Sequence, residues 1–322
     1  MKLTLLVLDQ VFDTGLTAML DILSMANDLD DEQGPHPRFE VSLAGHGAPV
    51  RTGLGFAIET QPYDAMAPAD WVIVPALAAK QPEPLTAALL REDLGPAKSF
   101  IQASRDGGAK IAAACTGTFI VAETGLLDGA EATTTWSLSP FFRQRYPKVK
   151  LDETRLVRYS NQIATAGAML GHVDLALWLV RQNSPDLAAR VARFMLIDTR
   201  SSQADYIIPD FLAHADPLIE RFDRWCHAHL AEGFNLQAAA DALHVHSRTL
   251  QRRTEAVLGK SPLAFFQDLR IEQARRLILQ GVPLEVIAEE VGYADATALR
   301  NLLRRKLGYG VTAIRAGQAG LQ

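Results

Sequence analysis

Two helix-turn-helix patterns within residues 235–306 constrain this 322-residue chain more than any other feature. In the first pattern, residues 235–243 carry apolar side chains at helical spacing, and a second helix is predicted from Ser247 to Leu258. Asn235 is suited to cap the first helix, and His246 or Ser247 is suited to cap the second. The spacing therefore predicts two short helices joined by a tight turn.

The second helix of this pattern has two different sides. Leu250 and Leu258 are predicted to face the core, which leaves Arg248, Gln251 and Arg252 on the outer side. Arg can pair with guanine and Gln with adenine through two hydrogen bonds each, so this side has the chemistry of base recognition. On a single helix, a solvated charged surface would be the simpler interpretation. A second unit of the same kind favours base recognition.

That second unit comprises residues 284–293 and 296–306. Gly292 supplies the backbone freedom that a tight turn needs, and Asp295 is placed to cap the following helix. An amphipathic segment over 262–280 joins the two units, and as a helix it would be about 28 Å long. This is close to one turn of DNA, about 34 Å, so the two units could enter successive major grooves.

Several motifs occur here in order over about 100 residues, namely RTLQRR (248–253), LGKSP (258–262), DLRIEQARRL (268–277) and IAEEVGY (287–293). Together they resemble the DNA-binding domain of AraC/XylS-type transcriptional regulators. The resemblance implies DNA contacts by Arg248, Gln251, Arg252, Arg253, Ala296, Thr297, Arg300, Asn301 and Arg304. Two positions depart from the family pattern: Thr254 replaces an aromatic core residue, and Gly310-Val311 replaces a Ser/Thr-Pro pair. The second departure predicts a less firmly docked final helix.

Charge and composition agree with this interpretation. From His246 onward the chain has 12 Lys and Arg against 7 Asp and Glu, whereas the whole chain has a net charge of −5. Basic charge confined to one segment suits a protein that contacts phosphates locally. The two cysteines, Cys115 and Cys226, lack metal-ligand spacing, and we predict no metal and no cofactor. No leader and no membrane-spanning run is recognised, so we expect a cytoplasmic protein.

The first two hundred residues alternate short apolar runs with longer amphipathic ones, which is typical of a doubly wound α/β sheet. Strands are predicted over 3–8, 39–44, 71–74, 110–114 and 162–166. Helices are predicted over 14–29, 85–90, 96–104, 118–123, 169–182 and 185–195. We expect an N-terminal domain over 1–198, a linker over 199–215 and an all-α domain with tandem helix-turn-helix units over 216–322.

Cys115 lies where the predicted strand 110–114 runs directly into a helix. Such an elbow can lift a thiol into a cleft, where the helix dipole would favour the thiolate. With the segments 125–129, 132–136 and 165–177, this elbow resembles the PfpI-type, flavodoxin-like domain of the class I glutamine-amidotransferase-like superfamily. A PfpI-like domain followed by an AraC-type domain is similar to the GlxA-like branch of AraC regulators. In that branch small nitrogen-containing metabolites are effectors.

Catalysis by Cys115 would need a neighbouring base. Active relatives carry a histidine at one of two positions, which are Thr116 and Thr135 here, so we expect a non-enzymatic domain. Cys115 then either fills a tight elbow or lines a ligand pocket. Further candidates for the pocket are Asp13, Thr14, Thr116, Thr135, Trp136 and His172. Helix capping would also explain Asp13 and Thr14, and core packing would also explain Trp136.

The sequence thus predicts a transcriptional regulator that binds double-stranded promoter DNA and responds to a small-molecule effector. Its expected partners are a second copy of the chain and, if it activates transcription, RNA polymerase. A cysteine-dependent hydrolase or deglycase-like enzyme fused to a DNA-binding domain is the alternative function. A dimerising scaffold without a ligand is a third possibility.

Overall fold

The protein was analysed as a computed structural model that describes residues 1–31, 36–198, 202–203, 206–213 and 216–315. The chain divides into two compact units. The first unit contains residues 1–138 and 146–204, and the second contains 139–145 and 205–322. Parts of the predicted linker 199–215 lie outside the described residues. The predicted domain limits stay predictions, and the segment 139–145 is the part of 1–198 that groups with the second unit.

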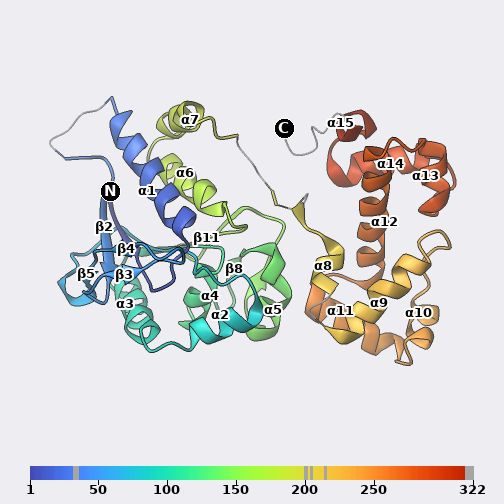
Figure 1. Cartoon of the computed structure of the whole chain (residues 1–322), viewed down its shortest axis with the longest axis horizontal. Helices are drawn as coiled ribbons and strands as arrows, with labels where there is room; N and C mark the ends of the chain where they lie inside the picture. The colour runs from blue at the N-terminus through green and yellow to red at the C-terminus, as the bar shows by residue number, and fades with distance from the viewer. Residues whose placement is uncertain (32–35, 199–201, 204–205, 214–215, 316–322) are drawn as a thin grey trace. The chain divides into compact units, whose positions relative to one another are not determined.

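The first unit is built on a seven-stranded sheet with the order β10-β11-β7-β6-β1-β2-β5 (Figure 1). Its strands are β1 (Lys2–Leu6), β2 (Glu40–Gly45), β5 (Gln61–Pro62), β6 (Trp71–Val74), β7 (Lys110–Ala114), β10 (Val157–Ser160) and β11 (Ile163–Ala166). All neighbours pair in parallel except β10 and β11. Short pairs are formed by β3 (Val50–Arg51) with β4 (Ala57–Ile58) and by β8 (Glu131–Ala132) with β9 (Lys150–Leu151).

Helices cover both faces of this sheet. On one face lie α1 (Asp13–Asp28), α6 (Gly171–Asn183) and α7 (Pro185–Phe194) (Figure 1). On the other lie α3 (Leu94–Asp106) and α4 (Gly117–Glu123), and α2 (Pro82–Leu89) precedes α3. The central strands are buried on both faces, which explains their near-continuous apolar sequences. The predicted doubly wound α/β fold is confirmed.

The second unit is helical. It contains α5 (Ser139–Arg145), α8 (Pro209–Ala213), α9 (Pro217–Ala228), α10 (Leu236–Ala242), α11 (Ser247–Leu258), α12 (Pro262–Leu279), α13 (Leu284–Glu290), α14 (Ala296–Leu307) and α15 (Val311–Arg315). The 18-residue helix α12 contributes to the packing of both helix-turn-helix pairs, α10–α11 and α13–α14 (Figure 1). The predicted all-α tandem arrangement is confirmed. Although the sequence predicted weak docking of the final helix, Ile314 of α15 is fully buried in the core beside α12.

Candidate DNA-binding interface and ligand pocket

The first helix-turn-helix pair forms much as the sequence predicts. The Asn235 side chain accepts hydrogen bonds from the backbone N–H groups of Gln237 and Ala238 at 2.9 and 3.0 Å, and so caps α10. The cap predicted for α11 is wrong: His246 makes no side-chain cap bond. Ser247 instead donates its hydroxyl to the Gln237 side chain at 2.5 Å. This bond ties the start of α11 to α10 across the turn.

Helix α11 turns its polar side outward. Leu250, Thr254 and Leu258 are buried, whereas Arg248, Gln251 and Arg252 are exposed, as the sequence predicted. Thr254 fits the core because its hydroxyl donates to the Leu250 carbonyl at 2.8 Å, which leaves no unpaired polar group there. The departure from an aromatic residue therefore does not disturb the helix.

Arg253 differs from its neighbours in α11. Its Nε donates to Asp216 at 2.6 Å, and Asp216 also accepts from the backbone N–H groups of Leu218 and Ile219 at the start of α9. Asp216 is 4% exposed, so its carboxylate is a buried connection between two helices. In this structure Arg253 holds α9 against α11, and its predicted role in DNA contact stays a prediction.

The second pair, α13–α14, presents a similar surface. Asp295 accepts a hydrogen bond from the backbone N–H of Ala298 at 2.8 Å and caps α14, as predicted. The exposed side of α14 carries Thr297, Arg300, Asn301 and Arg304. Ala296, which the resemblance assigned to DNA contact, is instead buried in the core of this pair because it lies on the inner side of the first turn.

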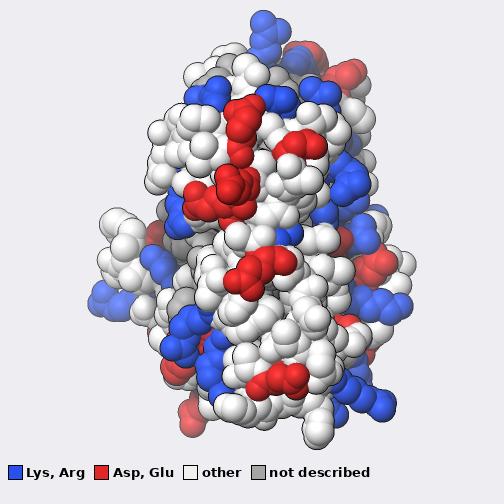
Figure 2. All heavy atoms as spheres, turned by 90° about the vertical axis from the view of Figure 1, so that its right-hand side faces the viewer, with Lys and Arg blue, Asp and Glu red and all other residues white. Residues whose placement is uncertain are grey.

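Acidic side chains limit how far the basic surface extends. Gln251 donates to Glu255 at 3.1 Å on α11, and Arg300 of α14 lies 4.0 Å from Glu285. Figure 2 shows acidic side chains along the middle of one face of the molecule, with Lys and Arg side chains at its borders. Cationic and acidic side chains thus lie side by side on this face and do not form one continuous basic surface.

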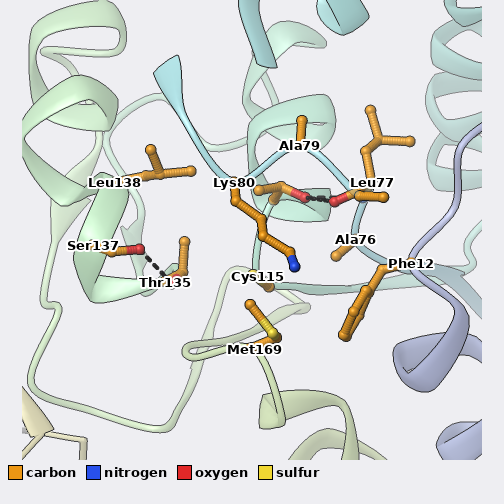
Figure 3. A pocket seen from close by; sticks show the side chains of 12 residues that line it. Phe12, Ala76, Leu77, Ala79, Lys80, Cys115, Thr135, Ser137, Leu138 and Met169 are labelled. Atoms are coloured by element: carbon orange, nitrogen blue, oxygen red, sulfur yellow. Dashed lines mark hydrogen bonds between the residues drawn. The ribbon is translucent and has the colours of Figure 1, made fainter. Parts of the chain in front are cut away.

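The first unit contains a pocket beside Cys115 (Figure 3), where β6 and β7 end. Cys115 lies between β7 and α4 with a φ of +52°, a conformation that is uncommon for residues other than glycine. Gly117 follows, and a Cβ at that position would lie 2.2 Å from the Val74 carbonyl oxygen. The predicted elbow is therefore present, and it depends on the close approach of α4 to β6.

The loop after β6 forms one wall of the pocket, and its backbone donors are already used. The N–H of Ala76 donates to His172 Nε2 at 3.0 Å, that of Leu77 to the Thr116 hydroxyl at 2.9 Å, and that of Ala78 to a carbonyl in the loop after β1 at 2.8 Å. The Thr116 hydroxyl donates back to the Leu77 carbonyl at 3.0 Å. Three consecutive N–H groups are thus unable to stabilise an oxyanion in the pocket.

The Cys115 thiol is not activated. Burial raises its pKa to about 11, against smaller lowering effects from hydrogen bonds with Thr116 and Thr135. The expectation that the helix dipole would favour the thiolate is wrong, because α4 is short and loss of solvation dominates. His172 is fully buried and cannot act as a base, since its Nε2 accepts from Ala76 and its Nδ1 donates to the Met169 carbonyl at 3.0 Å.

The remaining candidates for the pocket lie in different places. Thr116 and Thr135 line it together with Cys115. His172 does not line the pocket, but it accepts a hydrogen bond from the backbone of Ala76, which does. Asp13 is buried, and its carboxylate accepts from the backbone N–H of Leu54 at 2.9 Å. Thr14 is exposed and Trp136 is half-buried, and neither lines the pocket.

The chain is similar to several known proteins. A family model described as a helix-turn-helix domain matches residues 239–317. The transcriptional regulator GbdR of Pseudomonas aeruginosa is 24% identical over 225 residues, which cover 68% of this chain and 61% of GbdR. The transcriptional activator RhaS of Escherichia fergusonii is 31% identical over 111 residues, covering 34% of this chain and 40% of RhaS.

The C-terminal unit is an AraC-type helix-turn-helix domain. For the N-terminal unit, the crystal structure of an AraC family transcriptional regulator from Pseudomonas putida aligns with a TM-score of 0.51. That alignment covers 60% of this chain and 98% of the solved chain at 17% identity, and it shows a shared fold. The chain spans about 61% of the length of GbdR.

Sequence reasoning missed most of the wall residues. Phe12, Lys80, Ser137 and Met169 line the pocket although none belongs to a recognised motif. Their signal was positional: each follows a strand or precedes a helix at the carboxyl edge of the sheet, where open α/β folds bind ligands.

No helix within the described residues is long and apolar enough to cross a membrane.

Proposed function

We propose that this protein is a sequence-specific DNA-binding transcriptional regulator whose N-terminal unit binds a small-molecule effector. The observation that carries the proposal is the presence of two exposed polar surfaces, on α11 and α14, in one helical unit. Each surface combines Arg with an amide side chain, Gln251 on α11 and Asn301 on α14. Arg suits guanine and Gln or Asn suits adenine, so both helices can contribute to base recognition.

The linking helix supports a bipartite DNA site. With 18 residues, α12 is about 27 Å long, comparable with one turn of B-DNA at about 34 Å. We expect α11 and α14 to contact two short base motifs about one helical turn apart. Arg304, Arg305 and Lys306 at the end of α14 are exposed and suit phosphate contacts, which set affinity without selecting sequence.

Ligand binding without turnover is the role that we propose for the N-terminal unit. The thiol of Cys115 is protonated near neutral pH, and the loop N–H groups that could stabilise an oxyanion are bonded within the protein. A pocket with these properties can hold a molecule but has little means of transforming it. A second copy of the chain would raise affinity for paired DNA sites through effective concentration. If the protein activates transcription, we propose that it also contacts RNA polymerase.

Selection of bound duplexes from a random DNA library by the full chain tests the central proposal. We expect two enriched motifs separated by about ten base pairs. Affinity for the selected duplex should fall on the order of a thousandfold between about 50 and 200 mM salt if six phosphates are contacted. Enrichment of no motif, or affinity that is independent of salt, would contradict the proposal. Sedimentation of the full chain at micromolar concentration tests dimerisation separately.

A further inference from the structure

We infer that the pocket beside Cys115 binds a small carboxylate, with the anionic group at Lys80 and a compact apolar body against the remaining wall. The inference rests on the proposed effector role of the N-terminal unit and adds the chemical class of the ligand. It does not depend on DNA binding, because the pocket lies entirely within the first unit.

Lys80 is the residue that decides the sign of the ligand's charge. It is the one charged residue among the described residues that line the pocket, and no acidic side chain lines it. Figure 3 shows the Lys80 side chain extending over the pocket, with its nitrogen above Cys115 and Met169. Within the described chain, Lys80 takes part in no hydrogen bond or ion pair. Its ammonium group is therefore available to a ligand anion.

The rest of the wall is mainly apolar. Phe12, Ala76, Leu77, Ala78, Ala79, Leu138 and Met169 supply carbon surface around a cavity of about 40 Å³. A cavity of this size has room only for a compact group. A ligand ammonium group would meet Lys80 and would find no carboxylate among these residues. The pocket thus disfavours the cationic amines that a nitrogen-containing effector would suggest.

Two hydroxyl groups offer a second point of attachment. Thr135 and Ser137 lie 3.2 Å apart and share one hydrogen bond, and the Thr135 hydroxyl also bonds the Cys115 thiol, so a ligand would take the place of the thiol as its partner. The backbone N–H groups of Ala76, Leu77 and Ala78 are not available, because each is bonded within the protein. Recognition of an anion in this pocket therefore depends on Lys80 more than on the backbone.

A matched set of probes tests the inference with the full chain and without DNA. The probes are straight and branched carboxylates of three to eight carbons, each compared with the amide and the amine of the same skeleton. Binding would be measured by calorimetry and by thermal shift up to about 10 mM, which detects dissociation constants near 1 mM. We expect at least one carboxylate to bind, and its amide and amine to bind at least about fivefold more weakly.

Substitution of Lys80 provides the second arm. Lys80→Gln should weaken carboxylate binding at least about fivefold, the equivalent of about 1 kcal/mol for one solvent-accessible ion pair. Lys80→Glu should abolish carboxylate binding and favour the amine. Lys148→Gln is the control, because Lys148 is exposed and pairs with Asp128 away from the pocket.

Each outcome has a defined meaning. Absence of binding by every carboxylate, equal binding of the matched amine, or unchanged affinity in Lys80→Gln would overturn the inference. DNA selection with the same preparations separates this result from the proposed function. Specific DNA binding without carboxylate binding contradicts the ligand class alone, whereas loss of specific DNA binding contradicts the regulator.

Discussion

Arg270, in the middle of α12, donates two hydrogen bonds to the carbonyl oxygen of Leu230, at 2.9 Å from Nε and 2.6 Å from Nη2. Its guanidinium group also lies over the rings of Phe266 and Tyr293, at 4.7 and 5.3 Å from their centroids. Leu230 follows α9 in the first half of the AraC-type domain, and Tyr293 lies in the turn of the second half. Arg270 thus links the two halves from within the helix that joins them.

Replacing Arg270 should loosen this link. Arg270→Lys keeps the charge but loses the two-point bond to Leu230, which we expect to cost about 1.5–3 kcal/mol of stability in the helical unit. Hydrogen exchange of the amides in α9 and α12 would measure the change, because exchange resolves one unit of a two-unit chain. Arg276→Lys on the same helix is the control, since Arg276 is exposed. Equal protection in both variants would contradict the linking role.

Gly292 should tolerate no side chain. Its φ is +72°, and a Cβ there would lie 2.3 Å from Arg270 Nη2 and 2.6 and 2.7 Å from the carbonyl oxygens of Ala231 and Leu230. Gly292→Ala combines backbone strain with displacement of Arg270, so we expect a loss of about 3 kcal/mol or more in the stability of the helical unit.

Gly281→Ala is a matched control for that substitution. Gly281 has a φ of +79°, and nothing lies within 4 Å of its Cβ position. The control therefore reports the cost of the left-handed backbone alone, about 1 kcal/mol. Chemical denaturation of each variant measures its free energy of unfolding. Hydrogen exchange of the folded variants then shows whether the loss lies in the helical unit. A similar loss in the two proteins would mean that the close contacts of Gly292 are unimportant.

Stability of the N-terminal unit should fall in mild acid because of His172. Burial lowers the pKa of His172 to about 4, while the unfolded chain has a histidine pKa of about 6.5. Between these values the unfolded chain binds a proton that the folded unit does not, so stability decreases as pH falls from about 6.5 to 4. The full effect is about 3 kcal/mol.

Chemical denaturation of the N-terminal unit at a series of pH values measures this effect. His172→Gln removes the titrating group, so the contribution of about one proton to the slope should disappear. His46→Gln, at an exposed position, is expected to keep the slope of the original chain. An unchanged slope in His172→Gln would show that other groups cause the acid sensitivity.

The sequence predicted the regular elements better than the pocket. The strands Trp71–Val74 and Lys110–Ala114 were predicted with the bounds that the structure has, because buried parallel strands are continuous apolar runs. The antiparallel strand β10 was missed, since its sequence, VRYS, is half polar at the sheet edge. The short helix α5 was also not predicted, because a few residues give too little periodicity.

Side-chain roles were predictable where they follow from helical spacing and not where they depend on distant partners. The outward direction of Arg252 follows from the burial of Leu250 two positions earlier. The pairing of Arg253 with Asp216 joins residues 37 positions apart, and no local pattern indicates it. Lys80 was likewise not predicted to line the pocket. Its place beside Cys115 is set by the order of the strands and not by the sequence around it.

We expect α11 and α14 each to recognise bases in a different half of the DNA site. Arg252→Ala should relax the base preference in one half of the selected DNA site, with a loss of about 1–3 kcal/mol for a direct base contact, and Asn301→Ala should do the same in the other half. Both side chains are exposed on their helices, so the substitutions should leave the fold intact.

Arg105→Ala is the control, because Arg105 bonds to Gln162 in the N-terminal unit. Measuring each variant against duplexes with single-base changes in either half decides the matter. Uniform weakening on all duplexes would identify these residues as phosphate contacts instead.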